Sequence, residues 1–283
     1  MLKNTFLHIP GVGKLTEQRF WDSGILLWDQ FPSNDSIRMT PAKMDTITAC
    51  LDESRRNLDS RNPRYFSELL PANQHWRFFP EFRDSVAYLD IETTGLGSWN
   101  NAITTIALYD GNSIRHYVNG QNLDDFVNDV KKYKILVTYN GKTFDVPFIE
   151  SYFGISLNHA HIDLRYILSS LGYKGGLKYC EFQLGMDRGG LSDIDGYFAV
   201  LLWKDYQKSG NQEALETLLA YNIQDVLNLE ALMVTAYNLK MKETPFYATQ
   251  LPEPELIENP FQADVRIIDR IKGEVRFEHG NFW

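Results

Sequence analysis

The chain has 283 residues, of which 43% are hydrophobic and 23% charged, so it can bury a sizeable core without disulfide bonds. Its net charge of −9 argues against a nucleic-acid coat or architectural protein, but not against an enzyme whose clustered carboxylates are neutralised by metal ions. There is no run of about 18 apolar residues and no signal-peptide core, and Cys50 and Cys180 lack metal-like spacing. We therefore expect a cytoplasmic protein with reduced thiols and no membrane span.

The N-terminal part of the sequence is predicted to be helical. Apolar residues recur at helical spacing in residues 15–31. A second helix is predicted for residues 41–51, with Thr40 as its N-cap and Pro41 in its first turn. Residues 52–80 are rich in Arg, Asn and Pro, so we place a domain boundary there.

The pattern then changes to one that alternates between strands and helices. Runs of strand-forming residues predict strands at residues 85–91, 101–109, 113–118, 135–139 and 161–164. The pair Asp110-Gly111 is a strong signal for a hairpin turn between the second and third of these strands. The strand at residues 135–139 is apolar enough to be buried on both faces.

Helical spacing follows between and after the last strands. It predicts helices at residues 122–133 and 142–153, with Pro147 in the first turn of the latter, and an almost entirely helical region from residue 177. The last residues contain four prolines and one amphipathic stretch near 265–271. We therefore predict a small helical segment at 1–79, an α/β domain at 80–239 and an extended tail at 240–283.

Two acidic residues at the end of the first predicted strand are the first candidates for a functional site. Asp90 and Glu92 are two positions apart, so both side chains leave the sheet on the same face. Two carboxylates on one face repel each other unless a hard cation such as Mg²⁺ or Mn²⁺ lies between them. Thr93 and Thr94 then begin a loop with donors for a phosphate or sugar. These residues alone fit a pair of solvated edge-strand acids equally well.

Two further acids follow later in the sequence. Asp145 lies in the first turn of a predicted helix, where an acid also stabilises the helix dipole without any other function. Tyr221 and Asp225 are four positions apart and share one face of a predicted helix. They could hold a water molecule and a metal ion together, or form an ordinary surface pair.

Taken in order, these motifs resemble the DEDD superfamily of 3′→5′ exonucleases, which includes the DnaQ-like proofreading nucleases. The family pattern is matched by Asp90-x-Glu92, by Asn140-x-x-x-Phe144-Asp145 and by Tyr221-x-x-x-Asp225. The chain is most similar to the YprB-like group, many members of which carry His at the position of Tyr221. The similar motifs lie at residues 90–96, 139–145, 161–164, 177–178 and 222–226, and the resemblance covers residues 85–238.

The resemblance implies an α/β, RNase H-like fold with a mixed five-stranded sheet flanked by helices. It also implies a metal-dependent nuclease, a 3′→5′ exonuclease, acting on DNA or RNA with two Mg²⁺ or Mn²⁺ ions per site. The carboxylates of Asp90, Glu92, Asp145 and Asp225 would hold these ions. Tyr221 would orient the attacking water, because a free tyrosine is a poor base at neutral pH. The expected substrate contacts are Thr93, Thr94, Asn140 and Lys142.

Some alternatives remain open at this point. The same fold could host a structure-specific endonuclease or a non-catalytic nucleic-acid-binding module. His159, His161 and Asp163 would share a strand face and could bind zinc, but we favour Asp163 as the cap of the following helix. Residues 7–13 resemble the turn of a helix-hairpin-helix module, which would contact a nucleic-acid phosphate or simply pack on the α/β domain. The sequence predicts no oligomeric state.

Overall fold

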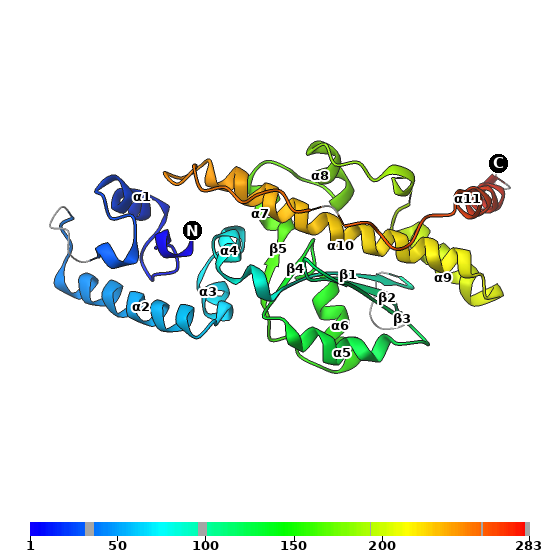
Figure 1. Ribbon diagram of the computed structural model, residues 1–283, viewed down its shortest axis with the longest axis horizontal. Helices are drawn as coiled ribbons and strands as arrows, with labels where there is room; N and C mark the ends of the chain where they lie inside the picture. Colours follow the sequence, from blue (N-terminus) through cyan, green and yellow to red (C-terminus); the bar gives the residue numbers. More distant parts are fainter. Residues whose placement is uncertain (32–36, 96–100, 193, 256, 281–283) are drawn as a thin grey trace.

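The computed structural model describes residues 1–31, 37–95, 101–192, 194–255 and 257–280. Leu96, at the end of the first acidic motif, lies outside the described residues. Figure 1 shows an elongated molecule with the N-terminal helices at one end, a sheet with its helices in the middle, and α11 (Val265–Gly280) at the other end. In the described part of the chain, no helix is both long and apolar enough to cross a membrane.

The centre of the molecule is a mixed five-stranded sheet. Its strands are β1 (Val86–Thr93), β2 (Ile103–Tyr109), β3 (Ile114–Val118), β4 (Ile135–Thr138) and β5 (Ala160–Asp163). Their order is β3-β2-β1-β4-β5, with the first three antiparallel and β1, β4 and β5 parallel. The α/β, RNase H-like fold predicted above is therefore confirmed.

The predicted hairpin turn joins β2 to β3. The Asp110 carboxylate accepts the backbone N–H groups of Asn112 and Ser113, at 3.0 and 2.8 Å. Gly111 has a φ of +89°, which a residue without a side chain adopts at little cost. The Asp-Gly pair thus supplies both the side-chain acceptor and the backbone freedom that the turn needs.

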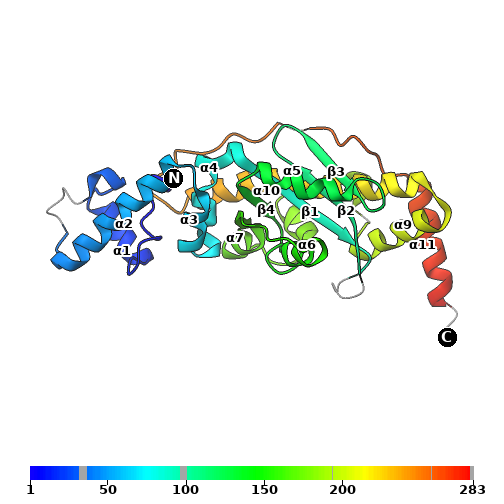
Figure 2. The same cartoon turned by 90° about the horizontal axis from the view of Figure 1, so that it is seen from below.

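Helices cover both faces of the sheet. One face is covered by α10 (Gln212–Met241), which runs along β1 and β2, and by α9 (Gly196–Ser209) (Figures 1 and 2). Helix α7 (Leu164–Ser170) packs against α10, and α8 (Leu177–Gln183) lies above α10 in Figure 1. The other face packs against α5 (Phe126–Asp129) and α6 (Asp145–Phe153). Ala87, Leu89 and Ile91 point to the α5 and α6 side, because they cluster with Phe126 and Phe148. Side chains alternate along a strand, so the even positions of β1, Asp90 and Glu92 included, face α10.

Several helices differ in extent from the predictions. The predicted helix at 122–133 is α5 alone, between the 3₁₀ turns η5 (Leu123–Asp125) and η6 (Val130–Lys132). Helix α6 begins at Asp145, and Pro147 lies in its first turn, where its missing N–H costs no hydrogen bond. Helix α11 is longer than the predicted amphipathic stretch, and its Ile268 and Ile271 are buried.

The N-terminal part of the chain is more regular than predicted. It contains η1 (Leu2–Asn4), α1 (Lys14–Asp22), η2 (Trp28–Gln30), α2 (Pro41–Asp59), α3 (Pro63–Leu69), η3 (Ala72–Arg77), α4 (Phe79–Phe82) and η4 (Arg83–Ser85). The Thr40 hydroxyl accepts the N–H of Lys43 at 3.4 Å, which confirms the predicted N-cap of α2. Most of residues 52–80, where the sequence places a domain boundary, are helical.

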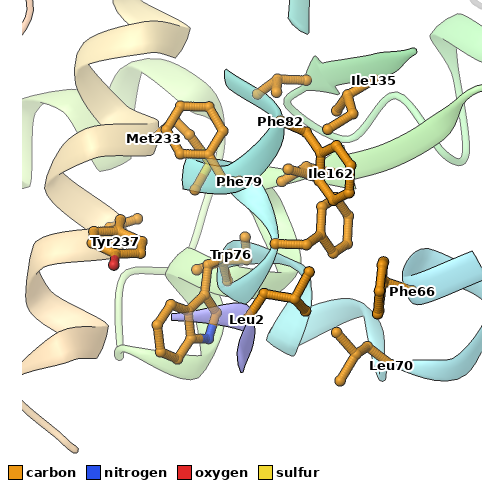
Figure 3. Packing of buried hydrophobic residues seen from close by; sticks show 14 of the residues in the cluster. Leu2, Phe66, Leu70, Trp76, Phe79, Phe82, Ile135, Ile162, Met233 and Tyr237 are labelled. Atoms are coloured by element: carbon orange, nitrogen blue, oxygen red, sulfur yellow. The ribbon is translucent and has the colours of Figure 1, made fainter. Parts of the chain in front are cut away.

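These N-terminal helices share a hydrophobic core with the sheet and α10. Figure 3 shows Leu2, Phe66, Trp76 and Phe82 packed near Ile135 and Ile162 of the sheet and Met233 and Tyr237 of α10, and all of them belong to one buried cluster. Between the Arg, Asn and Pro residues of 52–80 thus lie aromatic residues that are buried. The division of the chain into three parts stays a prediction.

The hairpin at residues 7–13 packs at the start of α1. Ile9 and Val12 are buried, and the buried Glu17 carboxylate accepts the N–H groups of Phe6 and Leu7, at 2.7 and 3.2 Å. Gly13 is the N-cap of α1. Packing therefore accounts for the apolar residues of the hairpin, and a nucleic-acid contact there stays a prediction.

Candidate active site

Three of the predicted acids meet where β1 ends beneath α10. Asp90 and Glu92 come from β1, and Asp225 comes from α10. Each offers one carboxylate oxygen, and the three oxygens lie within 4.8 Å of one another. The contact between α10 and β1 produces this arrangement, because the long helix carries Asp225 across the strand that holds the other two.

The fourth acid approaches from the start of α6. Asp145 is the first residue of that helix, and its Oδ1 accepts the N–H of Ile91 at 3.2 Å. It is buried and lines the same cavity as the other three, but it does not belong to their close group. The hydrogen bond to the backbone of β1 holds Asp145 beside Asp90 and Glu92.

Burial makes these four acids hard to ionise together. It raises the pKa of Asp90 and of Glu92 well above the usual range, and the neighbouring Asp225 raises both further. Burial also raises the pKa of Asp145 to about 7, and that of Asp225 to about 6 although Arg188 acts in the opposite direction. A divalent cation would remove this penalty, and such ions prefer carboxylate oxygens, so the residues present fit Mg²⁺ or Mn²⁺.

Asn222 fixes the orientation of Asp90. Its Nδ2 donates to Asp90 Oδ2 at 2.7 Å, and its Oδ1 accepts the hydroxyl of Thr105 at 3.0 Å. Asn222 and Thr105 are completely buried. Asp90 therefore presents its carboxylate in one defined orientation, as a ligand to a small ion requires.

Tyr221 lies beside the acids, with two cations against its ring. Lys178 Nζ is 4.9 Å from the ring centroid and the Arg188 guanidinium carbon is 5.9 Å from it. Burial raises the pKa of the Tyr221 phenol above its usual range, and Asp225 raises it further. The hydroxyl therefore stays protonated at neutral pH, where it can donate a hydrogen bond but cannot act as a base.

Arg188 occupies a position that no sequence motif predicted. Its Nη1 lies 2.5 Å from Asp225 Oδ1 in a buried ion pair. Its Nε and Nη2 both donate to the carboxylate of Glu181, the latter at 2.8 Å, and Glu181 also accepts from Asn228 at 2.9 Å. This buried network offsets the charge of Asp225 and holds its carboxylate in place. A lone arginine outside any motif gives no signal in a single sequence.

The residues predicted to contact substrate divide into two groups. Thr93, Thr94 and Asn140 line the cavity that contains the acids, whose volume is about 570 Å³. Lys142 does not line it; its amine lies 6.0 Å from the ring of Tyr166. The structure thus brings three of the four candidates to the acids, and a substrate contact by any of them stays a proposal.

The three candidates that line the cavity also hold its loops. Thr93 donates to the carbonyl of Gly95 at 2.7 Å, and the hydroxyl of Thr94 accepts the N–H of Ala102 at 2.9 Å. Asn140 has a φ of +67°, and its Oδ1 accepts the hydroxyl of Thr143 at 2.8 Å. These bonds give all three residues a structural role at the rim of the cavity.

The histidines near β5 have structural partners. His161 Nε2 is 2.8 Å from the hydroxyl of Thr138, and His159 Nε2 is 3.0 Å from the carbonyl of Val130. Asp163 caps α7 by accepting the N–H of Arg165 at 3.0 Å, as predicted. Among the residues with a described position, His159, His161 and Asp163 do not form a group that could hold a metal ion.

Comparison with known proteins identifies the family. The family model of the RNase H superfamily matches residues 87–237, from β1 into α10, and the chain belongs to that superfamily. At this coarse level it is a nuclease. No curated protein is similar enough to the chain to count as a match.

Two solved structures are similar to parts of the chain at low sequence identity. A structure described as Brucella melitensis NrnC bound to pGG is 17% identical, with a TM-score of 0.41, over 60% of this chain and 79% of that one. The family B DNA polymerase from the hyperthermophilic archaeon Pyrobaculum calidifontis is 15% identical, with a TM-score of 0.37. The match covers 62% of this chain and 31% of the polymerase.

Proposed function

We propose that the protein is a metal-dependent 3′→5′ exonuclease that hydrolyses phosphodiester bonds of a nucleic acid. The observation that carries this proposal is the convergence of Asp90, Glu92 and Asp225 within 4.8 Å in a buried cavity that Asp145 also lines. Buried acids at such spacing are costly in a purely structural role, because nothing but a cation or protons can relieve their repulsion. Membership of the RNase H superfamily supports hydrolysis as the reaction class.

The four acids would hold two Mg²⁺ or Mn²⁺ ions. When bound, such ions lower the pKa of an attacking water and stabilise the leaving 3′ oxygen. Asp90, with its orientation fixed by Asn222, would hold the ions together with Glu92, Asp145 and Asp225.

The remaining residues of the site bind the substrate, orient the attacking water and hold the acids in place. The protonated Tyr221 hydroxyl donates a hydrogen bond toward the water position next to Asp225. Thr93, Thr94 and Asn140 contact the sugar or phosphate of the terminal nucleotide from the cavity rim. Arg188 holds Asp225 in place and offsets part of the charge of the acids.

Cleavage of end-labelled strands tests the proposal. Single-stranded DNA and RNA carrying a 5′ label are incubated with the protein and Mg²⁺ or Mn²⁺, with Asp225→Asn as the inactive variant and Asp124→Asn, an exposed acid on the other side of the sheet, as the control. We expect a ladder that shortens from the 3′ end with wild type and Asp124→Asn, and no products with Asp225→Asn. Internal cuts would replace the exonuclease proposal by an endonuclease, and binding without any cleavage would overturn both.

A further inference from the structure

A second cavity adjoins the candidate active site along α9. The cavity that holds the acids and a neighbouring one of about 380 Å³ share two lining residues, Tyr197 and Lys204. The second cavity is also lined by Lys208 of α9 and by Arg270 of α11. Figure 2 shows α9 and α11 side by side at the end of the molecule away from the N-terminal helices. The two cavities therefore form a path from the acids to the groove between α9 and α11.

One face of α9 forms the floor of this path. Tyr197, Val200 and Lys204 line the first cavity and are three and seven positions apart, which places them on one side of the helix. Tyr197 is 59% exposed, whereas Tyr221 in the same cavity is buried. Its ring is thus open to a planar ligand at the boundary between the two cavities.

Positive charges along the path favour the binding of a polyanion that extends from the acids toward the second cavity. Lys204 is the one lysine or arginine among the described residues that line the first cavity. In the second cavity the two acids, Asp205 and Glu274, are both paired with Arg270, at 2.6 and 2.9 Å. No ion pair within the described ranges engages Lys204 or Lys208, so both amines are available to phosphate.

We propose that Tyr197, Lys204 and Lys208 form a track that binds the single-stranded end of the nucleic-acid substrate. Tyr197 stacks on an unpaired base near the reacting end, and the two lysines contact phosphates farther along the strand. α11 forms the second wall of the track. The inference rests on the proposed function and adds that the substrate is single-stranded, because a base that is already stacked in a duplex is not free to stack on the tyrosine.

Binding of fluorescent strands tests the track separately from cleavage. A labelled single strand of about 15 nucleotides is titrated by fluorescence anisotropy at several salt concentrations, using the full chain with Asp90→Asn to prevent hydrolysis. The test variants are Tyr197→Ser and the pair Lys204→Gln and Lys208→Gln. The matched control is the pair Lys131→Gln and Lys242→Gln, which removes two lysines that line neither cavity. The four lysines and Tyr197 lie at the surface, and melting temperatures check that folding is unchanged.

The expected results differ between the two kinds of contact. Loss of the stacking ring should raise the Kd about tenfold with little change in its salt dependence. Loss of the two lysines should reduce the slope of log K against log salt by about 1.4, and the control pair should behave like the parent protein. A duplex of the same sequence should bind more weakly than the single strand.

Each outcome decides the proposal. A Kd and salt slope for both test variants within error of the control pair would overturn the track, as would equal binding of duplex and single strand. If the wild-type chain still cleaves strands in that case, the proposed function stands and the track alone fails. If wild type neither binds nor cleaves any strand, both proposals fall.

Discussion

Replacing the buried Asp145 by asparagine should make the metal-free protein more stable, although the substitution removes one of the proposed metal ligands. Burial raises the pKa of Asp145 to about 7, whereas an unfolded aspartate has a pKa near 4. The folded chain therefore holds this proton more tightly than the unfolded chain. The contribution of Asp145 to stability is present below about pH 4, is lost as pH rises from about 4 to 7, and stays lost above that.

The size of the effect follows from the same pKa values. The folded and unfolded pKa values differ by about 3, and each pKa unit corresponds to about 1.4 kcal/mol. At pH 8 the charge on Asp145 therefore lowers the free energy of unfolding by about 4 kcal/mol. Asparagine carries no such charge and keeps an oxygen that can accept the N–H of Ile91. For a chain of this size, Asp145→Asn should then raise the melting temperature at pH 8 in EDTA by roughly 10 °C.

Thermal unfolding by circular dichroism measures this effect. Wild type, Asp145→Asn and the exposed control Asp124→Asn are compared in EDTA from pH 5 to 8, values that span the raised pKa, and again in Mg²⁺. We expect the advantage of Asp145→Asn over wild type to grow with pH in EDTA and to shrink in Mg²⁺, which stabilises only the intact site. A variant that is no more stable than wild type at pH 8 in EDTA would refute the charge penalty assigned to Asp145.

Three further substitutions test the surroundings of the acids. Tyr221→Phe should slow cleavage about tenfold or more and leave the pH–rate profile unchanged, because the phenol does not titrate in the assay range. Arg188→Gln should destabilise the chain to urea by about 3 kcal/mol or more, because Glu181 and Asp225 lose their buried counter-charge, and adding Glu181→Gln should recover part of this loss. Asp163→Ala should cost about 2 kcal/mol or more in thermal unfolding, because the backbone N–H groups of Asn140, Lys142 and Arg165 all lose their buried acceptor.

Each of these expectations has a contrary result. A Tyr221→Phe profile that loses one limb of its pH dependence would give the phenol a role as an acid or base. A double Glu181→Gln and Arg188→Gln variant less stable than Arg188→Gln alone would show that Glu181 does not depend on the arginine for its charge balance. An Asp163→Ala chain as stable as wild type would show that the three hydrogen bonds to Asp163 contribute nothing measurable to stability.

Most strands of the sheet could be predicted from short periodicities, whereas the grouping of the four acids into one site was predicted from the resemblance to the DEDD exonucleases. Alternation along a strand places Asp90 and Glu92 on one face, and four-residue spacing places Tyr221 and Asp225 on one side of a helix. The Asp110-Gly111 turn fixes the β2–β3 hairpin locally. These relations hold within a few residues and do not require knowledge of the tertiary structure.

Features that depend on distant packing could not be predicted. Arg188 reaches Asp225 only because the chain after α8 folds back over α10, and nothing near Arg188 in the sequence encodes that path. No individual helix was predicted within residues 52–80, because the prolines there suggested a domain boundary, whereas Pro63 stands at the first position of α3, where proline is well tolerated. The burial of Phe66 and Trp76 against the sheet and α10 stabilises this region, and such contacts are not visible in local patterns.

Calorimetric titration with Mn²⁺ tests most directly whether the acids form a metal site. Wild type, Asp225→Asn and Asp124→Asn are titrated at pH 8, above the raised pKa values of Asp145 and Asp225, so that these ligands are ionised. We predict two bound ions per chain for wild type and for Asp124→Asn, and the loss of at least one of them for Asp225→Asn. Titration curves for Asp225→Asn that match those of wild type would contradict the assignment of this cluster as the metal-binding centre.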